Sequence, residues 1–225
     1  MRVITNQAWP GIPPEVPGPN RPNRPGQPTP RPDRLPSHAE PAPGLAPWLE
    51  QRMFEQQTVA LTGHITDESA ARAASALMTL EALVSPRTGP VRLHISSPDG
   101  DLSAVFSLVD VLDAMRTPVR AVAIGTVGGA ALAVYAAADE RVAFPHARFR
   151  LAEPRVDQIA GTADDVTRAA GAHLRLLDDF VVRLAEVTGH PRSSIERDLS
   201  QRRDLSVPEA IEYGLVHKLA EPSKR

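Results

Sequence analysis

Residues 121–138 read AVAIGTVGGAALAVYAAA, an uncharged stretch around which the rest of the predicted architecture is arranged. A β-branched run that begins at Val119 predicts a buried strand over 119–124, and the alanine-rich half predicts a helix over 130–138. The glycines within 125–129 allow a tight turn and the close approach of another backbone. A strand that turns sharply into a helix is the geometry of a nucleophile elbow, whose free backbone N–H groups stabilise a developing oxyanion. This elbow contains no serine, cysteine or histidine.

Other interpretations of the same stretch fit it less well. Arg120, Asp139 and Glu140 border it, and its alanine and glycine content is unlike the leucine-rich and phenylalanine-rich composition of a membrane span. Its glycines match neither the Gly-Lys-Ser/Thr ending of a phosphate-binding P-loop nor the Rossmann spacing. We therefore predict no membrane segment, no nucleotide site and no cofactor.

The composition of the chain argues against several classes of function. The 25 basic and 27 acidic residues give a net charge of −2, which indicates neither a nucleic-acid-binding nor a membrane-binding surface. Cysteine is absent, which excludes disulfides, thiol catalysis and thiolate ligands and fits a reducing cytoplasm, the location we expect. The seven histidines include no i, i+4 pair, so we expect no metal site.

The sequence divides into three parts. Residues 1–47 hold 14 of the 23 prolines and lack apolar periodicity, so they cannot bury enough surface to offset their chain entropy. We predict that this segment is disordered, and we interpret it as a solvated leader rather than a docking tail. A folded domain over 48–220 follows, and 221–225 form a tail.

Strands and helices alternate along the folded domain. The expected strands are 58–63, 91–95, 119–124, 141–144 and 149–151. The expected helices are 48–56, 67–84 with Asp67 as its cap, 102–115, 130–138 and 162–188. Short connections between alternating elements predict an α/β fold built from right-handed parallel βαβ units. The last helix carries a continuous apolar stripe and exceeds the usual length of about 11 to 12 residues, so we expect part of it to pack against another subunit.

Six motifs resemble the proteolytic subunit of the Clp protease, the ClpP family, which has a crotonase-like fold. They occur in that family's order and spacing: LTG at 61–63, ISSPDG at 95–100, GTVGGAA at 125–131, PHAR at 145–148, ERD at 196–198 and SVPEAIEYGLV at 206–216. The resemblance implies stacked right-handed βαβ units with a long handle helix, which in that family joins two heptameric rings into a hollow chamber.

The resemblance also implies where a Ser-His-Asp triad would lie. It places the serine at Gly129, the histidine at Ala152 and the aspartate at Arg202. None of the three supplies the chemistry, because acyl transfer needs a hydroxyl, a base and a group that orients the base. A shifted alignment brings Asp198 or Asp204 to the third position but supplies neither of the first two. We therefore expect negligible peptidase activity by this mechanism.

Part of the catalytic frame is implied to survive the loss of these side chains. The resemblance assigns the oxyanion hole to the backbone N–H groups of Gly100 and Ala130. Glu153, beside the vacant histidine position, is a candidate base for a crotonase-like reaction. We expect Arg202 to pair with Glu153 or another acid, because a buried guanidinium without a partner is costly.

These expectations lead to one interpretation and two open alternatives. We interpret the chain as a ClpP-like subunit that has kept the fold, lost peptide hydrolysis and taken a structural or regulatory role. Its expected partners are copies of itself in a heptameric ring or double ring, active ClpP paralogues in a hetero-oligomer, and an AAA+ unfoldase. The alternatives are an active ATP-dependent Clp serine endopeptidase subunit with a misregistered or shared triad, and a crotonase-like acyl-CoA enzyme.

Overall fold

The computed structural model describes residues 47–83, 89–155 and 161–220. Every element described below belongs to one compact unit within 44–225. The predicted proline-rich segment, apart from Pro47, and the predicted tail 221–225 lie outside the described residues.

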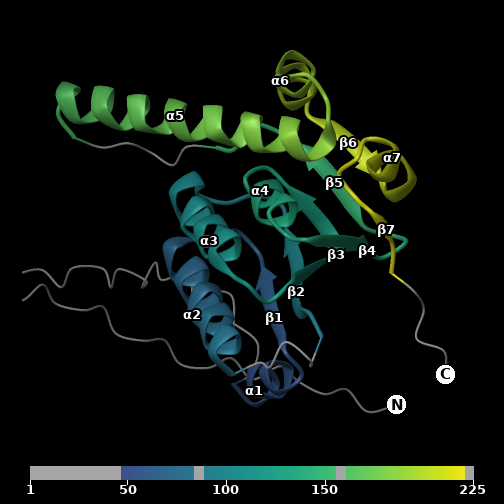
Figure 1. Ribbon diagram of the computed structural model, residues 1–225. Helices are drawn as coiled ribbons and strands as arrows, with labels where there is room; N and C mark the ends of the chain where they lie inside the picture. Colours follow the sequence, from purple (N-terminus) through teal and green to yellow (C-terminus); the bar gives the residue numbers. More distant parts are fainter. Residues whose placement is uncertain (1–46, 84–88, 156–160, 221–225) are drawn as a thin grey trace, which may run out of the picture. The chain divides into compact units, whose positions relative to one another are not determined.

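A largely parallel sheet forms the centre of this unit (Figure 1). Its main path, in spatial order, is β1 (Thr58–Thr62), β2 (Val91–Ser97), β3 (Val119–Gly128), β4 (Glu140–Ala143) and β7 (Lys218–Leu219). Each neighbouring pair on this path is parallel. Beside it, β5 (Arg148–Leu151) pairs in parallel with the end of β3 and antiparallel with β6 (Arg203–Ser206). The predicted α/β class and parallel pairing are confirmed, whereas β6 was not predicted.

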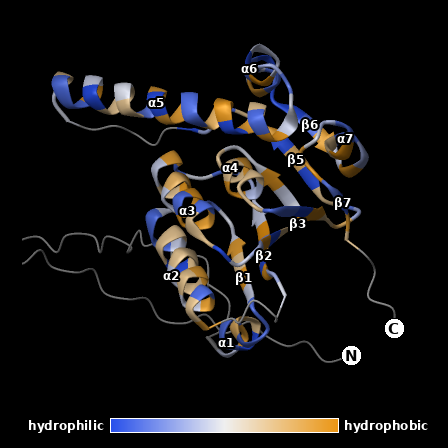
Figure 2. Ribbon diagram, in the orientation of Figure 1, coloured by the Kyte–Doolittle hydropathy of each residue, from blue (hydrophilic) through white to orange (hydrophobic). Residues whose placement is uncertain are grey.

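Helices cover this sheet and contribute most of the remaining core. In chain order they are α1 (Pro47–Glu55), α2 (Asp67–Leu83), α3 (Leu102–Ala114), α4 (Ala131–Ala136), α5 (Ala163–Thr188), α6 (Arg192–Ser200) and α7 (Val207–Glu212). Helix α2 packs against α3 and β1, and α3 packs against α4 and α5. Figure 2 shows apolar residues gathered on the strands and on α2, α3 and α4. Leu77 of α2, Leu93 of β2, Leu108 of α3 and Leu132 of α4 are fully buried in one continuous core.

The N-terminus of α2 differs from the prediction in one residue. Thr66, not Asp67, makes the capping contacts: its Oγ1 accepts a hydrogen bond from the backbone N–H of Ser69, and its own N–H donates to the Ser69 hydroxyl. Asp67 is the first residue of the helix, where its negative charge interacts favourably with the helix dipole.

Strand β3 is longer than expected because it contains a bulge. Ile95 of β2 pairs with Ala123, but Ser97 pairs with Val127, so β3 holds two extra residues between these pairs. The bulge includes Gly125, with φ of 68°. Beyond it the strand continues to Gly128 and pairs with β5. The turn predicted over 125–129 is therefore confined to the residues directly after Gly128, and α4 is shorter than the predicted helix over 130–138.

Both ends of α5 are closed by local signals. Thr162 and Asp165 form a capping box, in which the Thr162 hydroxyl accepts from the Asp165 N–H and the Asp165 carboxylate accepts from the Thr162 N–H. Gly189 ends the helix in the left-handed conformation with φ of 72°. The long helix predicted over 162–188 is thus confirmed, and 26 residues of it are helical.

Much of the apolar stripe of α5 is not covered by the other described elements. Phe180, Val181 and Leu184, near its C-terminal end, are buried against neighbouring elements. Nearer the N-terminus, Leu174 is 63% exposed and Val166 is 40% exposed. This half of the helix extends away from the sheet (Figure 1). No helix in the described part of the chain is long and apolar enough to cross a membrane.

Candidate functional site

The two backbone amides predicted as oxyanion donors lie at adjacent turns. Gly100 follows β2, and Ala130 follows β3, its direct neighbour in the sheet. The first turn is held in place by Ile65, whose N–H donates to the Asp99 carbonyl at 3.1 Å and whose carbonyl accepts from Asp101 N–H at 2.9 Å. The fold therefore brings the two predicted amides together from segments 30 residues apart in sequence.

The side chain of Asp99 joins these two amides. Its Oδ1 accepts a hydrogen bond from the Gly100 N–H at 2.9 Å and another from the Ala130 N–H at 3.1 Å. Its Oδ2 accepts a longer hydrogen bond from the Arg155 N–H at 3.4 Å. Both predicted donors thus point at a single carboxylate oxygen of the chain itself. The sequence interpretation missed this role of Asp99, although an acidic residue directly before one of the two donors was a signal for it.

Gly129, the position that the resemblance assigns to the serine, fits closely against this carboxylate. Its φ is 51°, in the left-handed region that side chains rarely adopt, and its N–H donates to the Arg150 carbonyl at 3.2 Å. A Cβ at this position would lie 2.1 Å from Asp99 Oδ1 and 2.6 Å from Asp99 Cγ. A side chain at 129 and the present position of the Asp99 carboxylate therefore exclude one another.

The other predicted triad positions contribute no polar contact to the two amides. Ala152, directly after β5, is half-buried, and Glu153 is exposed. Arg202 is exposed in the turn between α6 and β6 and has a φ of 51°. Within the described residues, neither Glu153 nor Arg202 forms an ion pair. The predicted pairing of Arg202 is not found among the described residues, where its side chain is exposed and water can solvate the charge.

The two alternative aspartates are engaged in contacts of their own. Asp198 is 4% exposed, and its Oδ2 accepts from the Tyr213 hydroxyl at 2.9 Å and from Arg203 Nη1 at 3.2 Å. Burial, followed by the hydrogen bond to Asp198, raises the pKa of Tyr213. Asp204 pairs with Arg150 Nε at 2.8 Å on the neighbouring strand. Neither aspartate orients a histidine.

No hydroxyl and imidazole meet in the described ranges. The His64 ring lies 3.3 Å from Asp101 Oδ1, and His217 Nδ1 accepts from the Arg141 N–H at 3.1 Å. No hydrogen bond between the described residues links a serine or threonine hydroxyl to a histidine ring. The same residues hold no group of three or more metal-ligating side chains.

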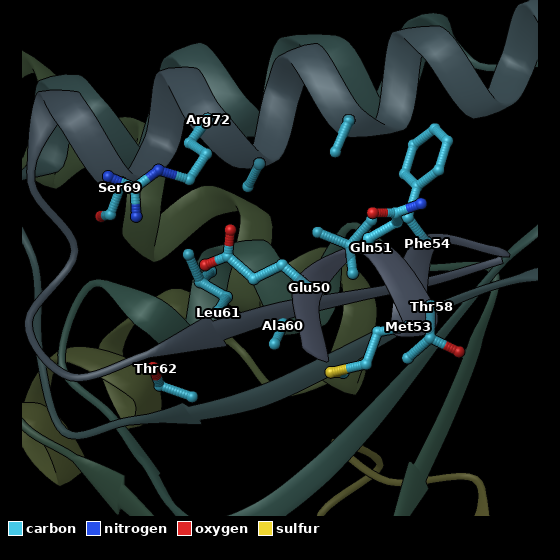
Figure 3. A pocket seen from close by; sticks show the side chains of 13 residues that line it. Glu50, Gln51, Met53, Phe54, Thr58, Ala60, Leu61, Thr62, Ser69 and Arg72 are labelled. Carbon is cyan, nitrogen blue, oxygen red and sulfur yellow. The ribbon is translucent and has the colours of Figure 1, made fainter. Parts of the chain in front are cut away.

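A separate cavity lies between α1, β1 and α2 (Figure 3). Its volume is about 360 Å³, and most of its lining is apolar, with Met53, Phe54 and Leu61 among the larger side chains. Glu50 and Arg72 supply charges to its wall. None of the predicted site residues lines this cavity.

A comparison with known protein families decides the assignment of the chain. The profile of the family Clp protease matches residues 47–223, which include every described element. The chain belongs to the Clp protease family. The resemblance drawn from the six motifs is confirmed, as is the fold that it implied.

Individual members of the Clp protease family are similar over most of the chain. ATP-dependent Clp protease proteolytic subunit 2 of Thermobifida fusca (strain YX) is 32% identical over 171 residues, which are 75% of this chain and 83% of that protein. Proteolytic subunit 3 of Rhodococcus jostii (strain RHA1) is also 32% identical, over 76% of this chain and 84% of its own length. A chloroplastic protein of Arabidopsis thaliana, named ATP-dependent Clp protease proteolytic subunit-related protein 2, is 26% identical over 80% of this chain and 65% of its own.

Proposed function

We propose that this Clp-family chain is a proteolytically inactive subunit with a structural or regulatory role in a Clp-type assembly. The observation that carries the proposal is the elbow after β3, where Gly129 supplies no hydroxyl. Peptide hydrolysis by a serine peptidase begins with the attack of a hydroxyl oxygen on the scissile carbonyl. Gly129 at the elbow of this chain supplies no such oxygen.

The expected loss of activity is large. Removing a serine triad leaves roughly 10³ to 10⁴ of rate acceleration, which comes from oxyanion donors and substrate binding. Enzymes typically reach about 10⁶ or more. In this chain we expect even that residual rate acceleration to be smaller, since the two amide donors already have a carboxylate acceptor in Asp99.

Active-site labelling of the purified full chain tests this proposal. A fluorophosphonate probe, a fluorogenic peptide and an unfolded protein substrate should give neither labelling nor cleavage, with an active ClpP subunit as the positive control. Labelling of a serine in this chain, together with peptide cleavage that the same probe abolishes, would show an active peptidase and refute the proposal.

We propose further that the subunit works within an oligomer. Leu174 and Val166 on α5 are exposed within a single chain, and apolar residues in a helical stripe are commonly covered by another subunit. The similar proteins from Thermobifida fusca and Rhodococcus jostii are named as proteolytic subunits, a term that places them in assemblies. The proposed assemblies are a heptameric ring or double ring of this chain and a hetero-oligomer with active ClpP paralogues, with an AAA+ unfoldase as a further partner.

Native mass measurement, alone and after co-expression with an active paralogue, distinguishes these assemblies. The variant Leu174→Asp should reduce the size of the assembly, because it places a charge in the proposed contact. Asp179→Ala, on the exposed part of the same helix, is the matched control and should leave the mass unchanged. A monomer at all concentrations, with and without the paralogue, would contradict the oligomeric role.

Neither alternative function has a specific observation in its favour. Glu153, the base in the acyl-CoA alternative, is exposed, and no hydrogen bond connects it to the described part of the site. An active peptidase would need both a hydroxyl and an imidazole from a neighbouring subunit. The inactive-subunit proposal requires neither addition.

A further inference from the structure

The carboxylate of Asp99 occupies the place where a substrate oxygen would bind. An oxyanion hole is defined by donors about 2.7 to 3.1 Å from the position of the developing oxyanion. Asp99 Oδ1 lies 2.9 Å from Gly100 N and 3.1 Å from Ala130 N. The oxygen of the chain's own side chain thus has the geometry of a bound oxyanion.

We propose that Asp99 is a built-in occupant of the two amides, and that it and Gly129 form a coupled pair that closes the site to acyl ligands. The inference deepens the proposed function, since it names what prevents binding rather than only what prevents hydrolysis. The inference depends on the geometry of Asp99 alone. The chain can therefore be inactive even if Asp99 does not occupy the two amides, and Asp99 can occupy them even if the chain has a different activity.

The contact also serves as a clamp between two elements. Asp99 lies in the turn after β2, whereas Ala130 follows β3, so the second hydrogen bond joins one turn to the other. Hydrogen bonds to a charged acceptor are stronger than those between neutral groups. The carboxylate therefore holds the turn after β2 against the elbow.

Gly129 is the residue that makes room for this clamp. With Asp99 in place, a Cβ at 129 would lie 2.1 Å from the carboxylate oxygen, far inside van der Waals contact. Without the carboxylate, the nearest remaining atom among those three neighbours is Asp99 Cα, at 3.2 Å. Shortening residue 99 thus removes the clash with a side chain at 129, whereas the strain from the positive φ of Gly129 remains in either background. One consequence is that a serine restored at 129 alone would not rebuild a working elbow.

A double-mutant cycle on the full chain tests the coupling. Gly129→Ala is measured by chemical denaturation in the native background and in the Asp99→Ala background. We expect Gly129→Ala to lower the folding equilibrium constant at least about tenfold more when Asp99 is present, because only then does the new methyl group displace a hydrogen-bonded carboxylate. If the single variant Gly129→Ala does not fold, folding of the double variant with Asp99→Ala would show the same coupling more strongly.

Asp101→Ala is the matched control, because Asp101 lies two residues away and its carboxylate contacts His64 instead. The effects of Asp101→Ala and Gly129→Ala on the folding equilibrium constant should be independent, so that the double variant shows their product. The proposal is overturned if the Asp99 and Gly129 substitutions are also independent, within about threefold in the folding constant.

Hydrogen exchange of the unmodified chain gives a second measurement that does not depend on any variant. The amide protons of Gly100 and Ala130 should both be protected, since each donates to the Asp99 carboxylate. Exchange of these two amides at the rate of an open backbone, while the adjacent strands stay protected, would show that the carboxylate does not occupy the site. The labelling assay of the proposed function decides a separate question, so the two can fail independently.

Discussion

Raising the pH above 10 should destabilise this protein through its two tyrosines. Tyr135 is fully buried and donates to the Val142 carbonyl at 3.0 Å, and Tyr213 is 6% exposed and donates to Asp198 at 2.9 Å. Burial is the main cause that raises the pKa of both hydroxyls above the usual value of 10. These are the only two tyrosines in the sequence, so every tyrosine signal reports on these sites.

The sign and size of the effect follow from proton linkage. Because the folded pKa is raised, the stabilising contribution is fully present below pH 10 and is lost as the pH rises toward the folded pKa. At about pH 11 an unfolded tyrosine has gained about 1.4 kcal/mol from losing its proton, whereas a folded hydroxyl with a raised pKa gains less. The two residues together lower the free energy of unfolding by at most about 2.8 kcal/mol, a large part of the typical 5 to 15 kcal/mol.

Tyrosinate absorbance and denaturant titrations measure this directly. The native protein should show little tyrosinate near pH 10, and the denatured protein should show both groups titrating there. Tyr135→Phe and Tyr213→Phe should each remove about half of the alkaline loss that depends on tyrosine. A native protein that forms tyrosinate with a midpoint near 10, while its circular dichroism stays unchanged, would refute the reasoning.

Two further predictions concern the ends of helices. Thr162→Ala removes the hydroxyl of the capping box and should destabilise the first turn of α5 by about 1 kcal/mol. The measurement is amide hydrogen exchange, which should become faster in that turn. Thr167→Ala, in the next turn, is the control and should have a smaller effect. Gly214→Ala should lower the urea midpoint more than Gly189→Ala, and equal midpoints would contradict this. Both glycines have positive φ, which costs alanine roughly 1 to 2 kcal/mol, but only at 214 would the methyl group meet a backbone oxygen, that of Thr188, at 2.8 Å.

Features that depend on neighbouring residues in sequence were predictable. The length of α5 followed from its apolar periodicity, and its C-terminal end followed from Gly189. The parallel pairing of the strands followed from alternating strand and helix patterns with short connections. These signals lie within a few residues of the structure that they specify, so one sequence was enough to interpret them.

Features that depend on pairing between distant segments were not predictable in the same way. The bulge in β3 arises from its register against β2, which no local pattern encodes. Strand β6 has only four residues, two of them charged, and forms because β5 offers it a partner. The reach of Asp99 to Ala130 likewise depends on the two turns lying side by side. Arg202 was expected to be buried, but the direction of its turn places it in water.

The split pairing of β3 gives the elbow a mechanical property. Before the bulge this strand pairs with β2 and β4. After it, β2 pairs with it again at Val127, β5 takes the place of β4, and the Gly129 N–H donates to the Arg150 carbonyl of β5. Gly125 therefore lies where one partner of β3 changes from β4 to β5, while β2 stays paired on its other side. The hydrogen bond from the Ala130 N–H to the Asp99 carboxylate links the turn after β3 to the turn after β2. We expect that losing this hydrogen bond would loosen the contact between the two turns, while β3 stays paired with both β2 and β5 at Val127.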